Sequence, residues 1–151
     1  MFALDEIDRK LLRELLTDSK RSYRELARAI GVSAATVINH VQRLKSAGVI
    51  KDYSARLDHE RLGYELTVIT EIVVSKGKLL ETDEEIAKIP NVCAVYDITG
   101  QTDAMVVAKF KSRNKLSDFT KALLAMPYVE RTNTHVVLTT VKEDFRLKDH
   151  V

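Results

Sequence analysis

Residues 22–33 read Ser-Tyr-Arg-Glu-Leu-Ala-Arg-Ala-Ile-Gly-Val-Ser, a stretch that predicts two short helices joined by a tight turn. Ser22 followed three residues later by Glu25 matches a capping box at the start of the first helix. Gly31 suits the left-handed conformation at which many helices end. Ser33 can then cap a second helix that begins at the next residue. Two helices in this arrangement form a helix-turn-helix.

A further helix precedes this pair. Apolar residues recur at helical spacing over residues 5–17. The pair itself is expected over residues 23–30 and from residue 34 to about residue 47, with Val37, Val41 and Leu44 as the buried stripe of the last helix. Residues 49–57 predict a strand, so the first 56 residues are typical of a winged helix-turn-helix.

Charge is distributed unevenly along the chain. The 151 residues contain 24 Lys and Arg against 22 Asp and Glu, a net charge of +2. Residues 1–56 hold 11 basic and 7 acidic residues, whereas residues 57–151 hold 13 and 15. A basic segment joined to a mildly acidic one suggests that only the first meets a polyanion. The alternative is an ordinary solvated surface, because charge does not determine fold.

The helix after Ser33 has the composition of a recognition helix, whose first residues contact base edges in the major groove. Asn39 can pair with adenine and Arg43 with guanine or phosphate, while His40 is either a base contact or a surface residue. A helix-turn-helix that serves only packing remains the alternative. The candidate DNA-binding residues are Arg21, Arg24, Ser33, Ala34, Ala35, Thr36, Asn39, His40, Arg43 and Lys45, with Lys51 as a further phosphate contact.

The rest of the chain contains an internal repeat, marked by the two prolines Pro90 and Pro127. Each follows a helical segment flanked by apolar strands, so the order is βαβ, a turn, then βαβ. This order predicts a ferredoxin-like fold, a four-stranded antiparallel sheet with two helices on one face. Its uncovered apolar face would pack on a second copy of the chain. The expected strands are residues 66–75, 93–99, 104–110 and 130–141.

We therefore expect an α+β protein with a DNA-binding domain over residues 1–56, a linker over 57–65 that is a short helix or hinge, and a βαββαβ domain over 66–151. The longest uncharged run, residues 29–42, has 14 residues, and a membrane span needs about 20. One cysteine, Cys93, allows no internal disulfide and no cysteine-cluster zinc site. We expect no leader, no membrane contact, no metal and no cofactor. A cytoplasmic location is therefore expected.

The whole chain resembles the Lrp/AsnC (leucine-responsive/asparagine) family of transcriptional regulators. The resemblance is carried by motifs in the same order and at the same spacing as in the family. They are residues 4–12 (LDEIDRKLL), 21–27 (RSYRELA), 31–33 (GVS), 43–45 (RLK), 48–50 (GVI), 62–63 (LG) and 100–103 (GQTD).

The resemblance implies DNA-binding homodimers that often assemble further, up to octamers, and a βαββαβ (RAM) domain that binds an amino-acid effector between subunits. Asp103 can hold an ammonium group, and Gly100 lets backbone N–H groups approach a carboxylate. Family members often have an aromatic residue where this chain has Thr102. A plain hairpin turn is the alternative for this stretch. The implied effector residues are Thr99, Gly100, Gln101, Thr102, Asp103, Tyr128, Thr132 and Thr134.

Two other functions compete with a regulator of this kind. An enzyme would need a nucleophile with a base, a metal cluster or paired carboxylates in a pocket. Cys93 is expected in the core, and nothing supports acid–base chemistry at Asp97 and Asp103, so we expect no catalysis. An architectural DNA-coating protein is the stronger rival, because Ala34 and Ala35 leave few base readers. The sequence predicts a sequence-specific regulator that responds to an amino acid.

Overall fold

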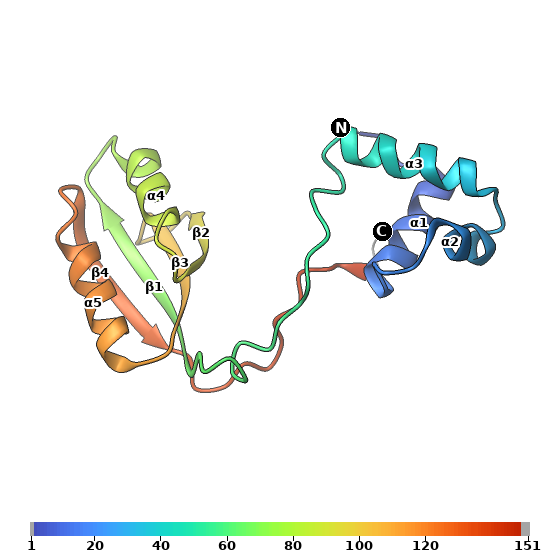
Figure 1. Ribbon diagram of the computed structural model, residues 1–151. Helices are drawn as coiled ribbons and strands as arrows, with labels where there is room; N and C mark the ends of the chain where they lie inside the picture. Colours follow the sequence, from blue (N-terminus) through green and yellow to red (C-terminus); the bar gives the residue numbers. More distant parts are fainter. Residues whose placement is uncertain (1, 149–151) are drawn as a thin grey trace. The chain divides into compact units, whose positions relative to one another are not determined.

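A computed structural model describes residues 2–148, which form two compact units (Figure 1). One unit combines the described parts of residues 1–56 and 142–151, and the other comprises residues 57–141. The C-terminal segment therefore belongs to the helical unit. No helix within the described residues is long and apolar enough to cross a membrane.

The helical unit consists of three helices, two of which begin at the predicted caps Ser22 and Ser33. They are α1 (Glu6–Thr17), α2 (Tyr23–Ile30) and α3 (Ala34–Ser46). Asp5 and Ser22 each begin a capping box, and the Ser33 hydroxyl accepts a hydrogen bond from the Thr36 backbone. Gly31 ends α2 with φ at 75°, in the left-handed region that favours glycine. The predicted helix-turn-helix is confirmed.

One face of each helix buries apolar side chains in a shared core. Leu11 of α1, Leu26 of α2 and Leu44 of α3 have no exposed surface, and Val37 and Val41 complete the predicted stripe of α3. Burying a leucine fully contributes about 1.5–3 kcal/mol relative to leaving it exposed. This small core holds α3 together with α1 and α2.

The strand predicted over residues 49–57 is wrong. The chain leaves α3 through Gly48, and the backbone N–H groups of Val49 and Ile50 both donate to the carbonyl of Leu44, at 2.9 and 3.2 Å. None of the described strands pairs with the following residues. A strand exists only with cross-strand hydrogen bonds, so an apolar alternating pattern alone does not make one.

The second unit is a four-stranded antiparallel sheet with two helices. The strands are β1 (Leu66–Val74), β2 (Val92–Asp97), β3 (Ala104–Phe110) and β4 (Val129–Val136), and the helices are α4 (Leu79–Ala87) and α5 (Arg113–Leu124). The strand order is β2-β3-β1-β4. The ferredoxin-like prediction is confirmed, and both helices end before the prolines that marked the repeat.

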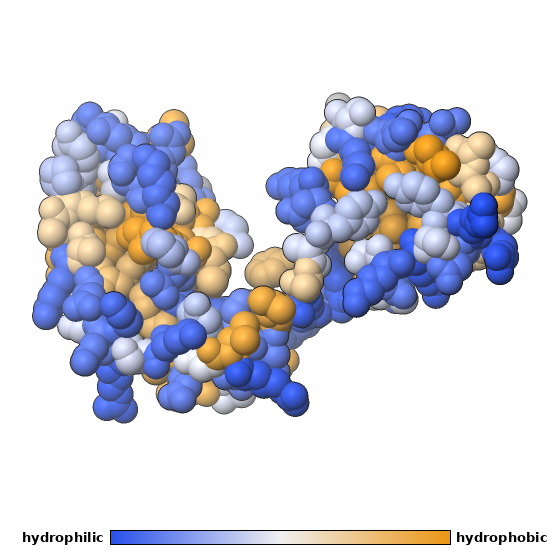
Figure 2. All heavy atoms as spheres, viewed as in Figure 1, coloured by the Kyte–Doolittle hydropathy of each residue, from blue (hydrophilic) through white to orange (hydrophobic). Residues whose placement is uncertain are grey.

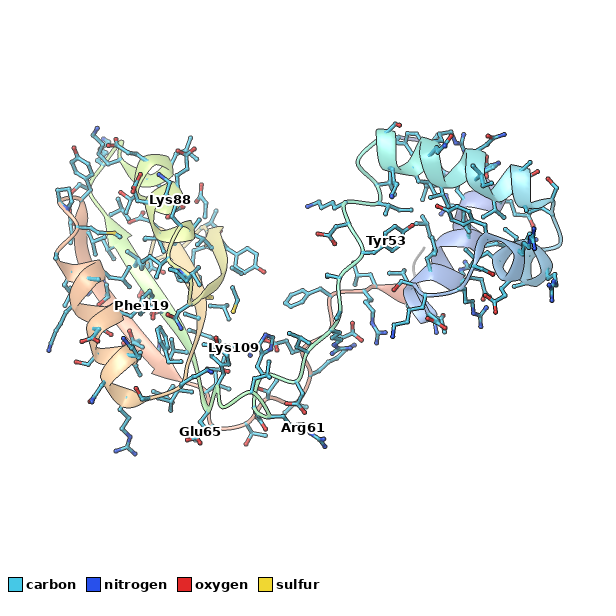
Figure 3. The ribbon with its side chains drawn as sticks, in the orientation of Figure 1. Tyr53, Arg61, Glu65, Lys88, Lys109 and Phe119 are labelled. Carbon is cyan, nitrogen blue, oxygen red and sulfur yellow. The ribbon has the colours of Figure 1, made fainter. Side chains whose placement is uncertain are left out.

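The core of this unit lies between the sheet and its helices. Every second residue of β1 from Val68 is buried, together with Ile86 of α4 and Phe119 of α5. The rings of Phe110 and Phe119 lie 5.1 Å apart, and Figure 3 shows Phe119 projecting from its helix. The alternate residues of β1 are only partly buried, so the opposite face of the sheet has no covering layer in one chain.

Three smaller expectations need correction. Strand β4 ends at Val136, not at residue 141, because β1 begins at Leu66 and offers no partner beyond the bond from the Val137 N–H to the Thr67 carbonyl. Cys93 is exposed instead of buried, since a register shift between β2 and β3 removes it from the regular alternation. Of the two alternatives for the 57–65 segment, the short helix is wrong, because the segment contains hydrogen-bonded turns and no helix.

Candidate DNA-binding and effector sites

Helix α3 carries a continuous exposed stripe made by Ala35, Ile38, Asn39 and Gln42. These residues are spaced by three or four positions, so they lie on one face of the helix. The opposite face is the stripe buried in the core. The exposed stripe includes the predicted Ala35 and Asn39. Sequence reasoning missed Ile38 and Gln42, although their helical spacing from Ala35 could have found them.

Three other predicted residues organise the start of α3. The Ser33 hydroxyl oxygen lies 2.8 Å from that of Thr36 and accepts from the Thr36 backbone N–H at 3.1 Å. Ala34 is partly buried and packs against the core. These side chains therefore shape the first turn of the helix, and Ala35 is the small residue there that faces outward.

His40 and Arg43 lie against α1. The Nδ1 atom of His40 is 2.8 Å from Oδ1 of Asp8. Arg43 donates to Oδ2 of Asp5 at 2.7 Å and also to Oδ2 of Asp8. The Arg43 guanidinium lies 5.5 Å from the centre of the Phe2 ring, within cation–π range. His40 and Arg43 were among the residues that sequence reasoning placed on the DNA-reading face, but both side chains bridge α3 to α1.

Asp8 is the charged group at the centre of this contact. Its side chain is fully buried. Burial raises the pKa of Asp8, but hydrogen bonds from Arg43, His40 and the Asp5 backbone outweigh burial, so that its pKa is lowered from the ordinary value. The bond to Asp8 in turn raises the pKa of Arg43. A buried carboxylate with these partners stays ionised at neutral pH.

The same group has the donor types of a metal site. One ligand atom each from Asp5, Asp8 and His40 lies within 4.8 Å of the others. However, the Arg43 guanidinium contacts both carboxylates. The chain therefore supplies the positive charge that a cation would bring, and the arrangement is that of an internal ion pair.

The four remaining predicted DNA-binding residues are basic. Arg24 and Lys51 are exposed. Arg21 is paired with Glu14 of α1, and the Lys45 ammonium lies 5.1 Å from the centre of the Tyr53 ring. Exposed cations bind phosphate without breaking a protein contact, which favours Arg24 and Lys51 among the predicted phosphate contacts.

The implied effector residues of the β2–β3 connection lie at one end of the sheet. Oδ2 of Asp103 accepts a hydrogen bond from the Val74 backbone N–H at 2.9 Å. The carbonyl of Tyr128 accepts one from the next residue, Ser75, also at 2.9 Å. The structure therefore attaches Asp103 and Tyr128 to consecutive residues at the end of β1. Thr99, Gly100 and Gln101 are exposed in the same connection, and Thr102 is partly buried.

Thr132 and Thr134 lie on one face of β4, the face covered by the helices. They pair with Ile72 and Thr70 of β1, which are both fully buried. The hydroxyl oxygens of Thr134 and Thr70 are 3.1 Å apart. Thr132 is therefore closer than Thr134 to the end that carries Asp103.

Sequence reasoning missed Asp83 of α4 at the same end of the sheet. One of its carboxylate oxygens is buried without a hydrogen-bond partner among the described residues. Burial, followed by repulsion from Asp97 and Asp103, raises the pKa of Asp83. Three carboxylates from different elements thus interact here. The topology that brings α4 over β2 and β3 is the only signal that could have revealed this.

Replacing Asp83 with asparagine should stabilise the protein at pH 7. The raised pKa means that the ionised form of Asp83 opposes folding, so this cost is absent at low pH and appears as pH rises through the normal carboxyl range. We expect a higher calorimetric melting temperature for Asp83→Asn at pH 7 and little change near pH 3. Glu84→Gln, on the exposed side of α4, is the control. A lower melting temperature for Asp83→Asn at pH 7 would contradict this account.

Known proteins match both units. Residues 4–51 match the family described as winged helix-turn-helix DNA-binding, and residues 67–147 match the Lrp/AsnC ligand binding domain. An HTH-type transcriptional regulator of Pyrococcus furiosus is 45% identical over 145 residues, which cover 96% of this chain and 98% of the relative.

Solved structures share the architecture. LrpC of B. subtilis is 31% identical with a TM-score of 0.83, covering 95% of this chain and 100% of that chain. A transcriptional regulator of Neisseria meningitidis in complex with L-Met is 26% identical with a TM-score of 0.86, covering 95% of this chain and 96% of that chain. These relatives are transcriptional regulators and not enzymes. The chain, with its helix-turn-helix and βαββαβ units, belongs to the Lrp/AsnC family of DNA-binding transcriptional regulators.

Proposed function

We propose that this regulator reads a specific DNA sequence through the exposed stripe of α3, and that an amino acid bound near Asp103 modulates its assembly or its affinity for DNA. The observation that carries the first part is the stripe itself, in which two amide side chains, Asn39 and Gln42, face outward beside two apolar ones.

The chemistry of the stripe suits base edges. Asparagine and glutamine can each form two hydrogen bonds with adenine, and apolar side chains contact the methyl group of thymine. Helix α3 contains no acidic residue that would repel DNA. Ala34 and Ala35 cannot form hydrogen bonds with bases, but the stripe also offers two amide side chains that can. The stripe therefore favours a sequence-specific regulator over a DNA-coating protein.

Removing the Gln42 amide should weaken specific binding only. We expect Gln42→Ala to lose about 1–3 kcal/mol on a duplex selected from a randomised pool with the wild-type protein, and nothing on a random-sequence duplex. Fluorescence anisotropy at fixed salt measures both affinities. Asn114→Ala, which removes an exposed amide of α5, should change neither. Equal wild-type affinity for both duplexes would instead support the coating protein.

The effector proposal rests on charge and on an open backbone. Asp83, Asp97 and Asp103 interact at one end of the sheet, and such a group of carboxylates favours an ammonium ligand. Gly100 has φ at 135°, and nothing lies within 4 Å of where a Cβ would stand, so its backbone is open to a carboxylate. The Neisseria relative with L-Met supports an amino acid as the ligand.

The Asp103 charge can be removed while its contact with β1 is kept. Asp103→Asn retains an oxygen that accepts the Val74 N–H but cannot pair with an ammonium group. We expect effector affinity to fall about 10-fold or more, since bonds to charged groups contribute about 1.5–3 kcal/mol. Titration calorimetry with the twenty amino acids first identifies the effector, and Asp118→Asn on α5 is the charge-matched control. Unchanged affinity in Asp103→Asn would refute the site.

We also propose a homodimer formed through the uncovered sheet face, with assembly to higher oligomers such as the octamers found in the family. This face presents partly exposed apolar residues from three strands: Ile69, Val73, Ala94, Tyr96, Met105 and Val107. Apolar residues on a face that its own chain leaves uncovered are typical of an interface between subunits. A second copy would also complete the effector site.

A cavity of about 210 Å³ in this unit lies among residues 60–67 and 137–140. It is not part of the proposed effector site, because Asp103 does not line it.

A charge at the centre of this face should dissociate the dimer. Val107 on β3 pairs with Ile69 on β1, and burying an unpaired glutamate there costs about 3–5 kcal/mol. We expect Val107→Glu to weaken dimerisation at least 100-fold, as measured by sedimentation velocity. Leu80→Glu changes an apolar residue of α4 that is already 74% exposed and should leave the mass unchanged. A dimeric Val107→Glu protein would exclude this interface.

A further inference from the structure

We propose that Asp8 is a positioning residue for DNA recognition. With Asp5 it holds His40 and Arg43 of α3 against α1, so that Arg43, although its side chain is 43% exposed, is paired with carboxylates of its own chain and is not a phosphate contact. This inference rests on the DNA-binding function and specifies how the chain presents its recognition helix. It differs from the sequence-based expectation that Arg43 pairs with guanine or phosphate.

Both carboxylate oxygens of Asp8 have partners. Oδ1 contacts Nδ1 of His40 at 2.8 Å, and Oδ2 accepts from the Asp5 backbone N–H at 3.0 Å and from Arg43. Asp5 completes the arrangement by accepting from the Asp8 backbone N–H at 2.8 Å and from Arg43 at 2.7 Å. These partners fix the position of the buried carboxylate, because a displacement would break its hydrogen bonds and leave its charge unpaired.

The two residues that Asp8 holds determine the rotation of α3. His40 and Arg43 are three positions apart and lie on one side of the helix. Each is the sequence neighbour of one proposed base reader, Asn39 or Gln42. Successive residues differ by about 100° around a helix, so fixing His40 and Arg43 also fixes the direction of both amides. A rotation of about 20° would move a side-chain tip by about 2 Å, more than a hydrogen bond tolerates.

A second consequence concerns charge. Each phosphate contacted by a cation releases a counterion, and the slope of log affinity against log salt concentration changes by about −0.9 per contact on duplex DNA. Arg43 faces two carboxylates, so it would add little to this slope. Loss of the Asp8 charge would leave Arg43 paired only with the exposed Asp5, and a phosphate of any sequence can then compete for Arg43.

A helix cap alone does not explain this arrangement. Asp5 already accepts a hydrogen bond from the Asp8 N–H as the N-cap of α1. The full burial of the Asp8 side chain and its two partners on another helix go beyond what a cap requires. A residue that only stabilised α1 would change neither the salt slope nor the preference among DNA sequences.

The test uses Asp8→Asn and compares the selected duplex with a random-sequence duplex over a range of salt concentrations. We expect the slope on random DNA to steepen by about 0.9 and the ratio of selected to random affinity to fall at least 10-fold. Adding Arg43→Gln to Asp8→Asn should return the slope to its wild-type value, because Arg43 is the cation released. Circular dichroism verifies that each variant is folded.

Two further variants keep the test decisive. Asp18→Asn makes the same charge change at the other end of α1 and should leave both measurements at wild-type values. Asp5→Asn retains a good N-cap while removing one of the two charges on Arg43, so it decides the matter if Asp8→Asn does not fold. The inference would be overturned if the folded variants kept the wild-type salt slope and the wild-type ratio of selected to random affinity. It would also be overturned if they lost affinity equally on both duplexes with the salt slope unchanged. A wild-type protein that binds no duplex would instead contradict the DNA-binding function.

Discussion

The carboxylate of Asp8 is buried in the helical unit, where an ionised group is tolerated only with hydrogen bonds and opposite charge around it. One of its partners is Asp5, the residue that caps α1, and the other two are residues of α3 that lie 32 and 35 positions away in the sequence. The small apolar core brings these helices together but is not directional. The Asp8 contacts are directional, and the outward face of α3 depends on them.

The sheet unit follows a different constraint. Its strands alternate between a face packed on α4 and α5 and a face with no cover from the same chain. Antiparallel pairing also brings the end of β1, the β2–β3 connection and the start of β4 to one end of the sheet. The face proposed for assembly and the end proposed for the ligand therefore adjoin. Such proximity is how ligand binding could alter assembly.

The connecting segments carry apolar residues that their own chain leaves exposed. Leu57, Leu62, Leu138 and Val141 are each more than 45% exposed, and apolar surface is visible along this part of the chain in Figure 2. Residues 49–57, after α3, are also without a partner in one chain. Their alternating pattern predicts a strand, but no described strand pairs with them. Both features are what a subunit of an assembly would show.

Local patterns were sufficient to predict the three helices of the first unit and the order of the helices and strands in the second. The capping residues Ser22 and Ser33, the glycine at position 31 and the repeat around Pro90 and Pro127 act within a few residues, so they can be recognised without knowledge of the fold. The strand over residues 49–57 failed because it requires a partner, which no local pattern supplies. Tertiary structure alone decided that His40 and Arg43 face Asp8 and that Asp83 lies near Asp103. These outcomes depend on which helices pack together and at what rotation, and that is set by contacts between residues far apart in the chain.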